Sequence, residues 1–280
     1  MILIKKIADL QNLLQSCRAG GHTVGFVPTM GALHQGHLAL VESSKAACEK
    51  TVCSIFVNPT QFTNRLDFEK YPISIEKDID LLEEAGCDVL FLPVVQEMYP
   101  ANEAVERYEL GYLEDILEGK YRPGHFQGVC QIVDKLLSVT KPHCLFIGQK
   151  DYQQCMVIQK MISLKKLPVA LQICETLREP NGLAMSSRNL RLSEEEKSKA
   201  AVLIQTLRTI QRDLKRGNVQ NLLQEAHNSL TSAGFEVDYV AIASAQNLLP
   251  VTDWDGEVKC VALVAATLNS VRLIDNILLN

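Results

Sequence analysis

The sequence lacks an excess of positive charge and a long apolar run, and each absence argues against a class of protein. Its 280 residues include 28 basic and 33 acidic side chains, which give a formal net charge of -5. Proteins that bind nucleic acid normally present a basic excess or a basic stripe, so we expect no nucleic-acid partner and no tRNA synthetase. No apolar run approaches ~18 residues, the length of a membrane span. We therefore expect no membrane partner.

The sequence also lacks a paired-cysteine motif. Its nine cysteines are an odd number, are scattered, and include no C-x-x-C pair. Most lie in apolar runs, as Cys53, Cys144, Cys174 and Cys260 do. This distribution favours buried free thiols in a reducing compartment over a disulfide framework. Because the first residues also lack the apolar core of a signal peptide, we expect a cytoplasmic protein.

What the sequence does contain is enough apolar side chain for a sizeable core, at 47% hydrophobic residues. The first part of the chain alternates strand-like runs with helical patterns. This alternation predicts an α/β fold, a Rossmann-like doubly wound parallel sheet. The predicted strands are residues 23–27, 51–57, 89–93, 143–147 and 170–174. The predicted helices are residues 5–20, 38–50, 75–85 and 129–139, and one that ends near residue 165.

The order of elements changes in the last third of the chain. Ser193 and Glu196 form a capping-box pattern that begins a helix to about residue 215. A second helix ends near Gly234, and strand-like runs follow at 237–243, 258–268 and 271–276. Helices followed by strands predict a smaller C-terminal α+β domain. We place the two domains at residues 1–177 and 178–280.

Residues 28–37 form the stretch around which the first domain is organised. They connect a buried strand to a helix, and Gly31 and Gly36 leave room for a ligand at the backbone. A helix N-terminus presents N–H groups and a positive dipole end to an anion, most often a phosphate. His34 and His37 are three residues apart, so both point into the same space. A turn glycine with ordinary helix-start residues is the alternative, and a metal site would need a further ligand that no nearby residue supplies.

Two further loops follow predicted strands. Gln61 comes after the second strand and offers an amide, and Lys150 comes after the fourth and offers a positive charge. Ligands of open α/β sheets bind beyond the carboxyl ends of the strands, so we expect these loops to converge. A third segment, residues 186–188, combines two hydroxyls with an arginine, which suits the phosphates of a reacting triphosphate. Solvent-facing or helix-capping residues remain the alternatives at all three places.

These motifs resemble known ones. Residues 28–37 are similar to the His-x-Gly-His motif of the nucleotidyltransferase superfamily, and residues 185–188 resemble its Lys-Met-Ser-Lys-Ser loop. Residues 28–34, 56–62, 122–126 and 148–154 resemble the pantothenate synthetase (pantoate–β-alanine ligase) family, and the likeness continues across essentially the whole chain. Gln149 departs from the glutamate that is common there, and Ile147 from phenylalanine.

The resemblance implies an enzyme that condenses pantoate with β-alanine through a pantoyl-adenylate and releases AMP and pyrophosphate, in pantothenate and coenzyme A biosynthesis. It implies ATP, pantoate and β-alanine as small-molecule substrates, Mg²⁺ as the companion of ATP, a homodimer, and a C-terminal domain that acts as a lid. The catalytic roles fall to His34, His37 and Lys150, with His37 also the proton donor.

The resemblance further implies a set of binding residues. Those for ATP are Met30, Gly31, Ala32, Leu33, His34, Gln35, Gly36, His37, Gly148, Gln149, Lys150, Asp151, Leu177, Met185, Ser186, Ser187 and Arg188. Gln61 and Gln154 would bind pantoate, and Gln61 also β-alanine. Asp78, in an acidic helix that Lys77 interrupts, is a candidate magnesium ligand, and Arg122 a candidate phosphate contact.

Two other functions stay open. Another nucleotidyltransferase, such as one that makes a dinucleotide cofactor, would share the turn of residues 28–37, here named the Gly/His turn. It would not need Gln61 and Gln154 in this setting. A non-catalytic nucleotide-binding module would need the phosphate turns but no second substrate site.

Overall fold

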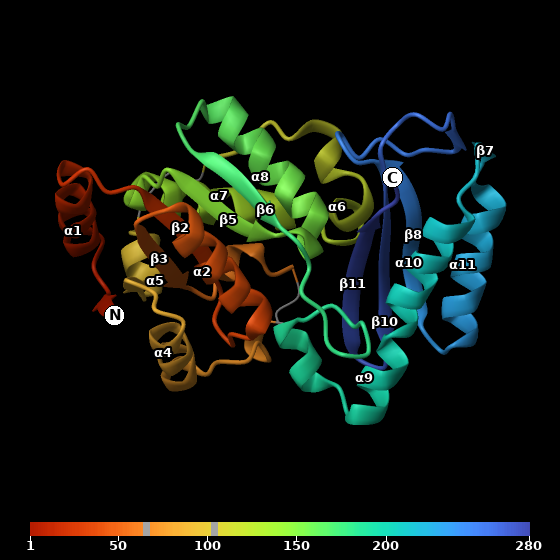
Figure 1. The fold of residues 1–280 in the computed structure, drawn as a ribbon, viewed down its shortest axis with the longest axis horizontal. Coiled ribbons are helices and arrows are strands. Elements are labelled where there is room, and N and C mark those ends of the chain that lie inside the picture. The colour runs from red at the N-terminus through yellow and green to blue at the C-terminus, as the bar shows by residue number, and fades with distance from the viewer. Residues whose placement is uncertain (64–67, 102–105) are drawn as a thin grey trace. The chain divides into compact units, whose positions relative to one another are not determined.

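A computed structural model describes residues 1–63, 68–101 and 106–280, and the chain divides into two compact units (Figure 1). The first unit comprises Met1–Gln149 and Gln154–Glu175, and the second comprises Lys150–Gln153 and Thr176–Asn280. The sequence pattern contained no sign that the short segment Lys150–Gln153 groups with the second unit.

The first unit is built on a six-stranded sheet of order β1-β4-β3-β2-β5-β6. Every neighbouring pair of its strands is parallel, which confirms the predicted doubly wound α/β fold. The strands are β1 (Ile2–Ile4), β2 (Val24–Thr29), β3 (Lys50–Ile55), β4 (Val89–Phe91), β5 (Cys144–Gly148) and β6 (Ala170–Cys174). The chain moves from β2 to β3 and β4 on one side and places β5 and β6 on the other. The order therefore reverses between β2 and β5, the position where open sheets bind ligands.

The helices of the first unit fall between these strands. They are α1 (Ile7–Ala19), α2 (Gln35–Ala47), α4 (Ile75–Glu84), α5 (Val95–Met98), α6 (Leu117–Tyr121), α7 (His125–Thr140) and α8 (Tyr152–Lys165), with 3-10 turns η1 (Pro59–Gln61), η2 (Gly111–Glu114) and η3 (Gln149–Asp151). Leu38 and Val41 of α2 and Leu82 of α4 pack with Val27 and Leu90 of the sheet in one core cluster. Burial of these apolar faces stabilises the layered arrangement.

The structure corrects several predicted boundaries in this unit. Strand β1 was not predicted, because three residues are too few to show a periodic pattern, yet Ile2 pairs with Val89 at the sheet edge. Helix α7 begins at His125 and not at residue 129, directly after Gly124, whose φ is 81°. The stretch from 94 to 123, where no helix or strand was predicted, contains the short helices α5 and α6.

The second unit contains a three-stranded antiparallel sheet of order β11-β10-β8. Its strands are β8 (Glu236–Ser244), β10 (Cys260–Leu268) and β11 (Val271–Leu278), and β7 (Gly217–Asn218) pairs separately with β9 (Asp253–Trp254). Its helices are α9 (Glu194–Ala200), α10 (Val202–Asp213) and α11 (Gln220–Ser232), with the 3-10 helix η4 (Ser187–Arg191). Leu203, Leu207 and Ile210 of α10 join Ala262 and Val264 of β10 in its core. This arrangement confirms the smaller α+β domain.

The capping box of Ser193 and Glu196 is present in both directions, as predicted. The helix it begins is shorter than expected, because α9 ends at Ala200 and α10 begins at Val202. Elsewhere, no helix of the described residues is long and apolar enough to cross a membrane.

All nine cysteines lie within the described residues and are free thiols. Cys48, Cys53 and Cys87 are buried. Burial raises the pKa of the Cys48 thiol, which also contacts Cys144, to about 11, and burial likewise raises the pKa of Cys87 to about 11. A raised thiol pKa lowers the fraction of reactive thiolate at neutral pH.

We predict that these two thiols react slowly with iodoacetamide in the folded protein. At pH 8 a thiol of pKa about 11 is roughly 100-fold less ionised than an ordinary one. Labelling of Cys48 and Cys87, followed by peptide mass spectrometry, should therefore be at least about 100-fold slower in buffer than in urea. Half-buried Cys17 serves as the internal control that reacts in the folded state. Equal rates at Cys48 or Cys87 with and without urea would contradict the prediction.

Candidate functional site

The turn between β2 and α2 carries an unusual backbone. Gly31 has φ 81° and Ala32 has φ 49°, two successive left-handed residues that reverse the chain. A Cβ on Gly31 would lie 3.0 Å from Asp78 Oδ2 and 3.0 Å from Ile55 Cγ2. Glycine is therefore required here by protein packing as well as by its conformation.

His34 and His37 meet at the N-terminus of α2. Their ring centroids lie 4.0 Å apart, so the predicted shared direction of the two rings is confirmed. His34 Nδ1 accepts from Gly36 N at 3.1 Å, and His37 Nδ1 accepts from His34 N at 3.4 Å. Because each Nδ1 is an acceptor, each neutral ring carries its hydrogen on Nε2. The helix start thus combines two imidazole donors with the positive end of the helix dipole.

Asp78 of α4 binds the backbone N–H groups of the same turn. Its carboxylate is fully buried. Oδ2 accepts from Ala32 N at 2.8 Å, and Oδ1 accepts from Leu33 N at 2.8 Å and from Ser74 Oγ at 3.0 Å. Both oxygens are therefore engaged with protein donors. Among the residues that the structure describes, no three His, Cys, Asp or Glu side chains gather as a metal site would require. The magnesium role of Asp78 stays a prediction.

Gln61 lies beside this turn, at the end of η1. Its Nε2 donates to Met30 Sδ at 3.0 Å, and its Oε1 accepts from Asn58 Nδ2 at 3.2 Å. Asn58 is 1% exposed and also donates to Gly128 O, while Tyr99 OH donates to Asn58 Oδ1 at 2.8 Å. Asn58 and Tyr99 are supporting residues that were not predicted from the sequence. Asn58 stands in the same motif as Gln61, which was the available signal.

The N-terminus of α7 supports the Gln61 loop from another side. His125 Nδ1 donates to Gln61 O at 2.8 Å, and Arg122 Nη1 donates to His125 Nε2 at 3.0 Å. A Cβ on Gly128 would meet the backbone of Thr60 and lie 2.7 Å from Gln61 Cα, so only glycine permits this approach. Arg122 also lies 3.7 Å from Glu118. The structure thus gives residues 122–128 a supporting role, and the phosphate contact of Arg122 stays a prediction.

The end of β5 brings a third predicted segment to the same edge of the sheet. β5 pairs with β2, and β2 pairs with β3, and the carboxyl ends of parallel neighbours lie together. Gly148 ends β5 and accepts from Cys155 Sγ at 3.4 Å. Gln149 follows, and Gln154 is half-buried in the first turn of α8. The first unit therefore gathers the Gly/His turn, Gln61 and Gly148 at three adjacent strand ends.

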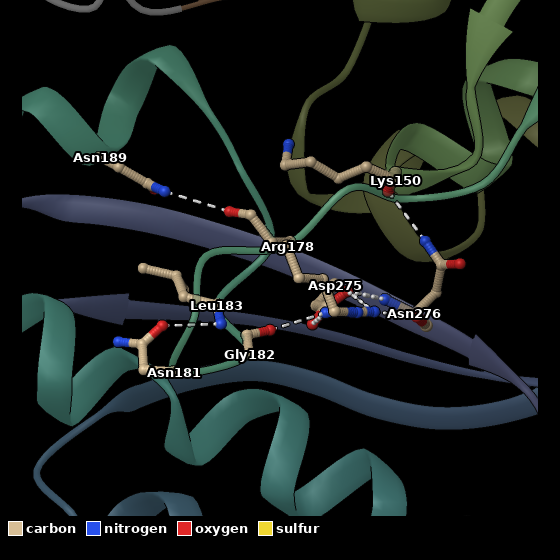
Figure 2. Close-up of polar contacts among 9 residues, drawn as sticks. Lys150, Arg178, Asn181, Gly182, Leu183, Asn189, Asp275 and Asn276 are labelled. Atoms are coloured by element: carbon tan, nitrogen blue, oxygen red, sulfur yellow. Dashed lines mark hydrogen bonds and ion pairs between the residues drawn. The ribbon is translucent and has the colours of Figure 1, made fainter. Parts of the chain in front are cut away.

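The other predicted residues belong to the second unit. Lys150 Nζ lies 3.8 Å from Asp151 Oδ2, and the Lys150 side chain is 16% exposed. The Lys150 carbonyl accepts from Asn276 Nδ2 at 2.8 Å (Figure 2). The Lys150 side chain therefore pairs with a neighbouring carboxylate, and the Lys150 backbone is bound by a side chain of β11.

Leu177 and Met185 lie at the two ends of a tight hairpin in the second unit. Met185 N donates to Leu177 O at 3.0 Å, and Arg178 bridges to Ala184. Directly after it, Ser186 caps η4 by accepting from Arg188 N at 3.3 Å. The capping role left open by the sequence is thus present, and the phosphate contacts of residues 186–188 stay predictions.

Comparison with known proteins covers the whole chain. A family model described as Pantoate-beta-alanine ligase matches residues 2–278. A pantothenate synthetase of Cytophaga hutchinsonii is 43% identical over 284 residues, which cover 100% of this chain and 99% of the relative. A pantothenate synthetase of Cereibacter sphaeroides is 43% identical over 277 residues, 98% of each chain.

Solved structures agree with the sequence relatives. A pantothenate synthetase of Thermus thermophilus superposes with a TM-score of 0.91 at 40% identity, over 99% of each chain. A pantoate-beta-alanine ligase of Francisella tularensis, complexed with beta-gamma ATP and beta-alanine, has a TM-score of 0.84 at 35% identity and covers 99% of this chain and 97% of its own.

We predict that Asp78→Asn loosens the β2–α2 turn. The amide puts an N–H₂ group where Ala32 N or Leu33 N now donates, and leaving a buried donor unpaired costs about 1–3 kcal/mol. The free energy of unfolding in urea should fall by that amount. Asp80→Asn, on an exposed position of the same helix, is the control and should change it by less than about 0.5 kcal/mol. An Asp78→Asn protein as stable as the control would contradict the prediction.

Proposed function

The chain belongs to the pantoate-beta-alanine ligase family, and we propose that it uses ATP to condense pantoate with β-alanine. A carboxylate oxygen of pantoate attacks the α-phosphorus of ATP, which forms pantoyl-adenylate and releases pyrophosphate. The amine of β-alanine then attacks the acyl carbon and AMP leaves. The match to the family over residues 2–278 is the observation that carries this proposal.

The residues of the chain need not supply a covalent nucleophile, because the substrates provide both. Their task is to stabilise negative charge on the phosphates and to align the reacting atoms. We assign His34 and His37 to the phosphates, with His37 as proton donor. The assignment is supported by the close approach of their two tilted rings at the start of α2 and by the Nε2 hydrogens that the Nδ1 contacts require.

Gln61 and Gln154 are assigned to pantoate, and Gln61 also to β-alanine. The Gln61 amide donates to Met30 Sδ, and a thioether is a weak acceptor. A carboxylate or hydroxyl oxygen of a substrate is a stronger one, so a substrate can replace the sulfur with a gain in hydrogen-bond strength. Asn58 keeps the amide oriented during this exchange.

In the second unit, Lys150 and Arg188 are assigned to the β- and γ-phosphates, with Ser186 and Ser187 as hydroxyl donors and residues 178–280 as a lid. Leu177, which is 42% exposed, is assigned with Met30 of the first unit to the adenine and ribose of ATP. Met185 is assigned to ATP as well. An ammonium group binds phosphate as a point charge, and a guanidinium group binds it through two parallel hydrogen bonds.

Magnesium is assigned to the substrate as the Mg²⁺ complex of ATP. Both oxygens of Asp78 already accept hydrogen bonds from the turn and from Ser74, so we place the ion on the phosphates and route no step through a protein ligand. The family likeness supports a homodimer. The free thiols of all nine cysteines support a reducing compartment such as the cytoplasm.

Omission of each substrate in turn tests the proposed function. AMP should form from ATP only when pantoate and β-alanine are both present, and labelled pyrophosphate should exchange into ATP with pantoate alone. AMP formation without pantoate, or ATP binding without any exchange, would overturn the proposal. The second result would favour a non-catalytic nucleotide-binding module, and a dinucleotide product from other substrates would favour a different nucleotidyltransferase.

We predict that Lys150→Ala lowers the rate of adenylate formation at least about 100-fold. The negative charge that develops on the phosphates loses the ammonium group that would stabilise it. Single-turnover quench with labelled ATP measures this step. The fold should remain intact by circular dichroism, and Lys5→Ala, at an exposed position, is the matched control. Adenylate formation at the wild-type rate would remove Lys150 from the mechanism.

We predict that Gln61→Ala raises the KM for pantoate about 10- to 100-fold, the effect of losing a hydrogen bond to a charged group. The KM for ATP should change less than about twofold, which is small beside a hydrogen-bond loss. Steady-state kinetics with each substrate varied separates the two constants, and exposed Gln11→Ala is the control. Equal increases in both constants would contradict the assignment of Gln61.

A further inference from the structure

Two adjacent polar residues lie buried in β11, between the apolar residues Ile274 and Ile277. Asp275 is 3% exposed and Asn276 is 2% exposed. A buried carboxylate or amide destabilises a protein unless its hydrogen bonds are made. Both side chains have partners far away in the sequence, and those partners belong to the two segments of the second unit that carry the predicted phosphate-binding groups.

Asn276 contacts the first of these segments. Its Nδ2 donates to the carbonyl oxygen of Lys150 at 2.8 Å, across 126 residues of sequence (Figure 2). The bond acts on the backbone of Lys150 and leaves the ammonium group for other contacts. It therefore sets the point from which the lysine side chain extends.

Asp275 contacts the second segment through Arg178. The guanidinium forms a fork on the carboxylate, with Nη1 to Oδ2 at 2.7 Å and Nη2 to Oδ1 at 3.1 Å. It also donates to Gly182 O at 3.1 Å and to Asn276 O at 3.2 Å. Figure 2 shows these bonds converging on one guanidinium. Such bidentate charged pairs define geometry more closely than single hydrogen bonds do.

The hairpin that Arg178 holds leads directly into the loop of residues 186–188. Asn189 Nδ2 donates back to Ala184 O at 3.1 Å, and Met185 N donates to Leu177 O at 3.0 Å. The segment is therefore fixed on both sides of Ser186. One dipeptide of β11 thus supports the backbone of Lys150 and the base of the Ser186–Arg188 loop.

We propose that Asp275 and Asn276 are positioning residues for the adenylation half-reaction. They fix Lys150 and the Ser186–Arg188 loop to a common strand, so that the ammonium, hydroxyl and guanidinium groups keep one spacing suited to a triphosphate. Small displacements of such groups lower reaction rates steeply. The inference rests on the proposed function and adds two residues to it that do not touch the substrate.

The test compares the two half-reactions in Asn276→Ala. Pyrophosphate exchange into ATP should fall about 10- to 100-fold in kcat, as expected for displaced phosphate-binding groups. The KM for pantoate should stay within about twofold, since Gln61 and Gln154 lie in the first unit. Pantothenate formation from supplied pantoyl-adenylate and β-alanine should keep its wild-type rate, because no triphosphate takes part.

Asp238→Asn is the matched control, because it weakens another ion pair of β11. Arg272 Nε lies 2.6 Å from Asp238 Oδ2, and this pair joins β11 to β8 rather than to Lys150 or the hairpin. This variant should lose stability and keep the exchange rate at temperatures below unfolding. Arg178→Lys is the second variant if Asn276→Ala does not fold. It keeps the charge beside Asp275, loses the fork, and should also slow exchange selectively.

Exchange at the wild-type rate in the folded variants would overturn the inference. So would an equal loss in both half-reactions, because that is the result of a purely structural role. These outcomes are separate from a failure of the proposed function, which would appear in the wild-type protein as absence of pantothenate formation.

Discussion

A buried carboxylate that binds backbone N–H groups is the constraint on which the first unit depends. Asp78 accepts from Ala32 N and Leu33 N, at the centre of a turn with two left-handed residues. Such a turn has a high intrinsic cost for Ala32, and a bond from another helix stabilises it. This turn determines where α2 begins and therefore where His34 and His37 meet. It also positions Met30 against Gln61.

The same device recurs at each predicted part of the site. A buried side chain holds the backbone or the amide of a residue that we propose to contact a substrate. Asn58 orients the Gln61 amide and is itself bound by Tyr99. Asn276 binds the backbone of Lys150, and Asp275 binds Arg178 at the base of the following hairpin. Buried hydrogen bonds of this kind rigidify the groups that they hold, and alignment of charged substrates requires rigid groups.

Much of the architecture could be predicted from local patterns. Runs of β-branched and apolar residues marked five of the six parallel strands. Gly20, Gly86 and Gly234 marked the ends of α1, α4 and α11. The predictions that were wrong concern short or tertiary-dependent elements. β1 has only three residues and forms because β4 offers an open edge. The helix expected from 193 to 215 is divided between α9 and α10 at Ala201, a good helix former that no local pattern identifies as a break.

The alternating fold could be predicted from the amino-acid sequence alone. The phosphate-binding role of the β2–α2 turn and the residues assigned to each substrate are also sequence predictions, and the latter rest on family motifs. These properties are readable because they depend on periodicity and on short stretches of neighbouring residues. The contacts that hold those residues in place depend on the tertiary structure. Asp78 lies 46 residues from Ala32, and Asn276 lies 126 residues from Lys150. A hydrogen bond between such distant groups forms because the fold brings them within about 3 Å of one another, and neither partner carries a local pattern that names the other.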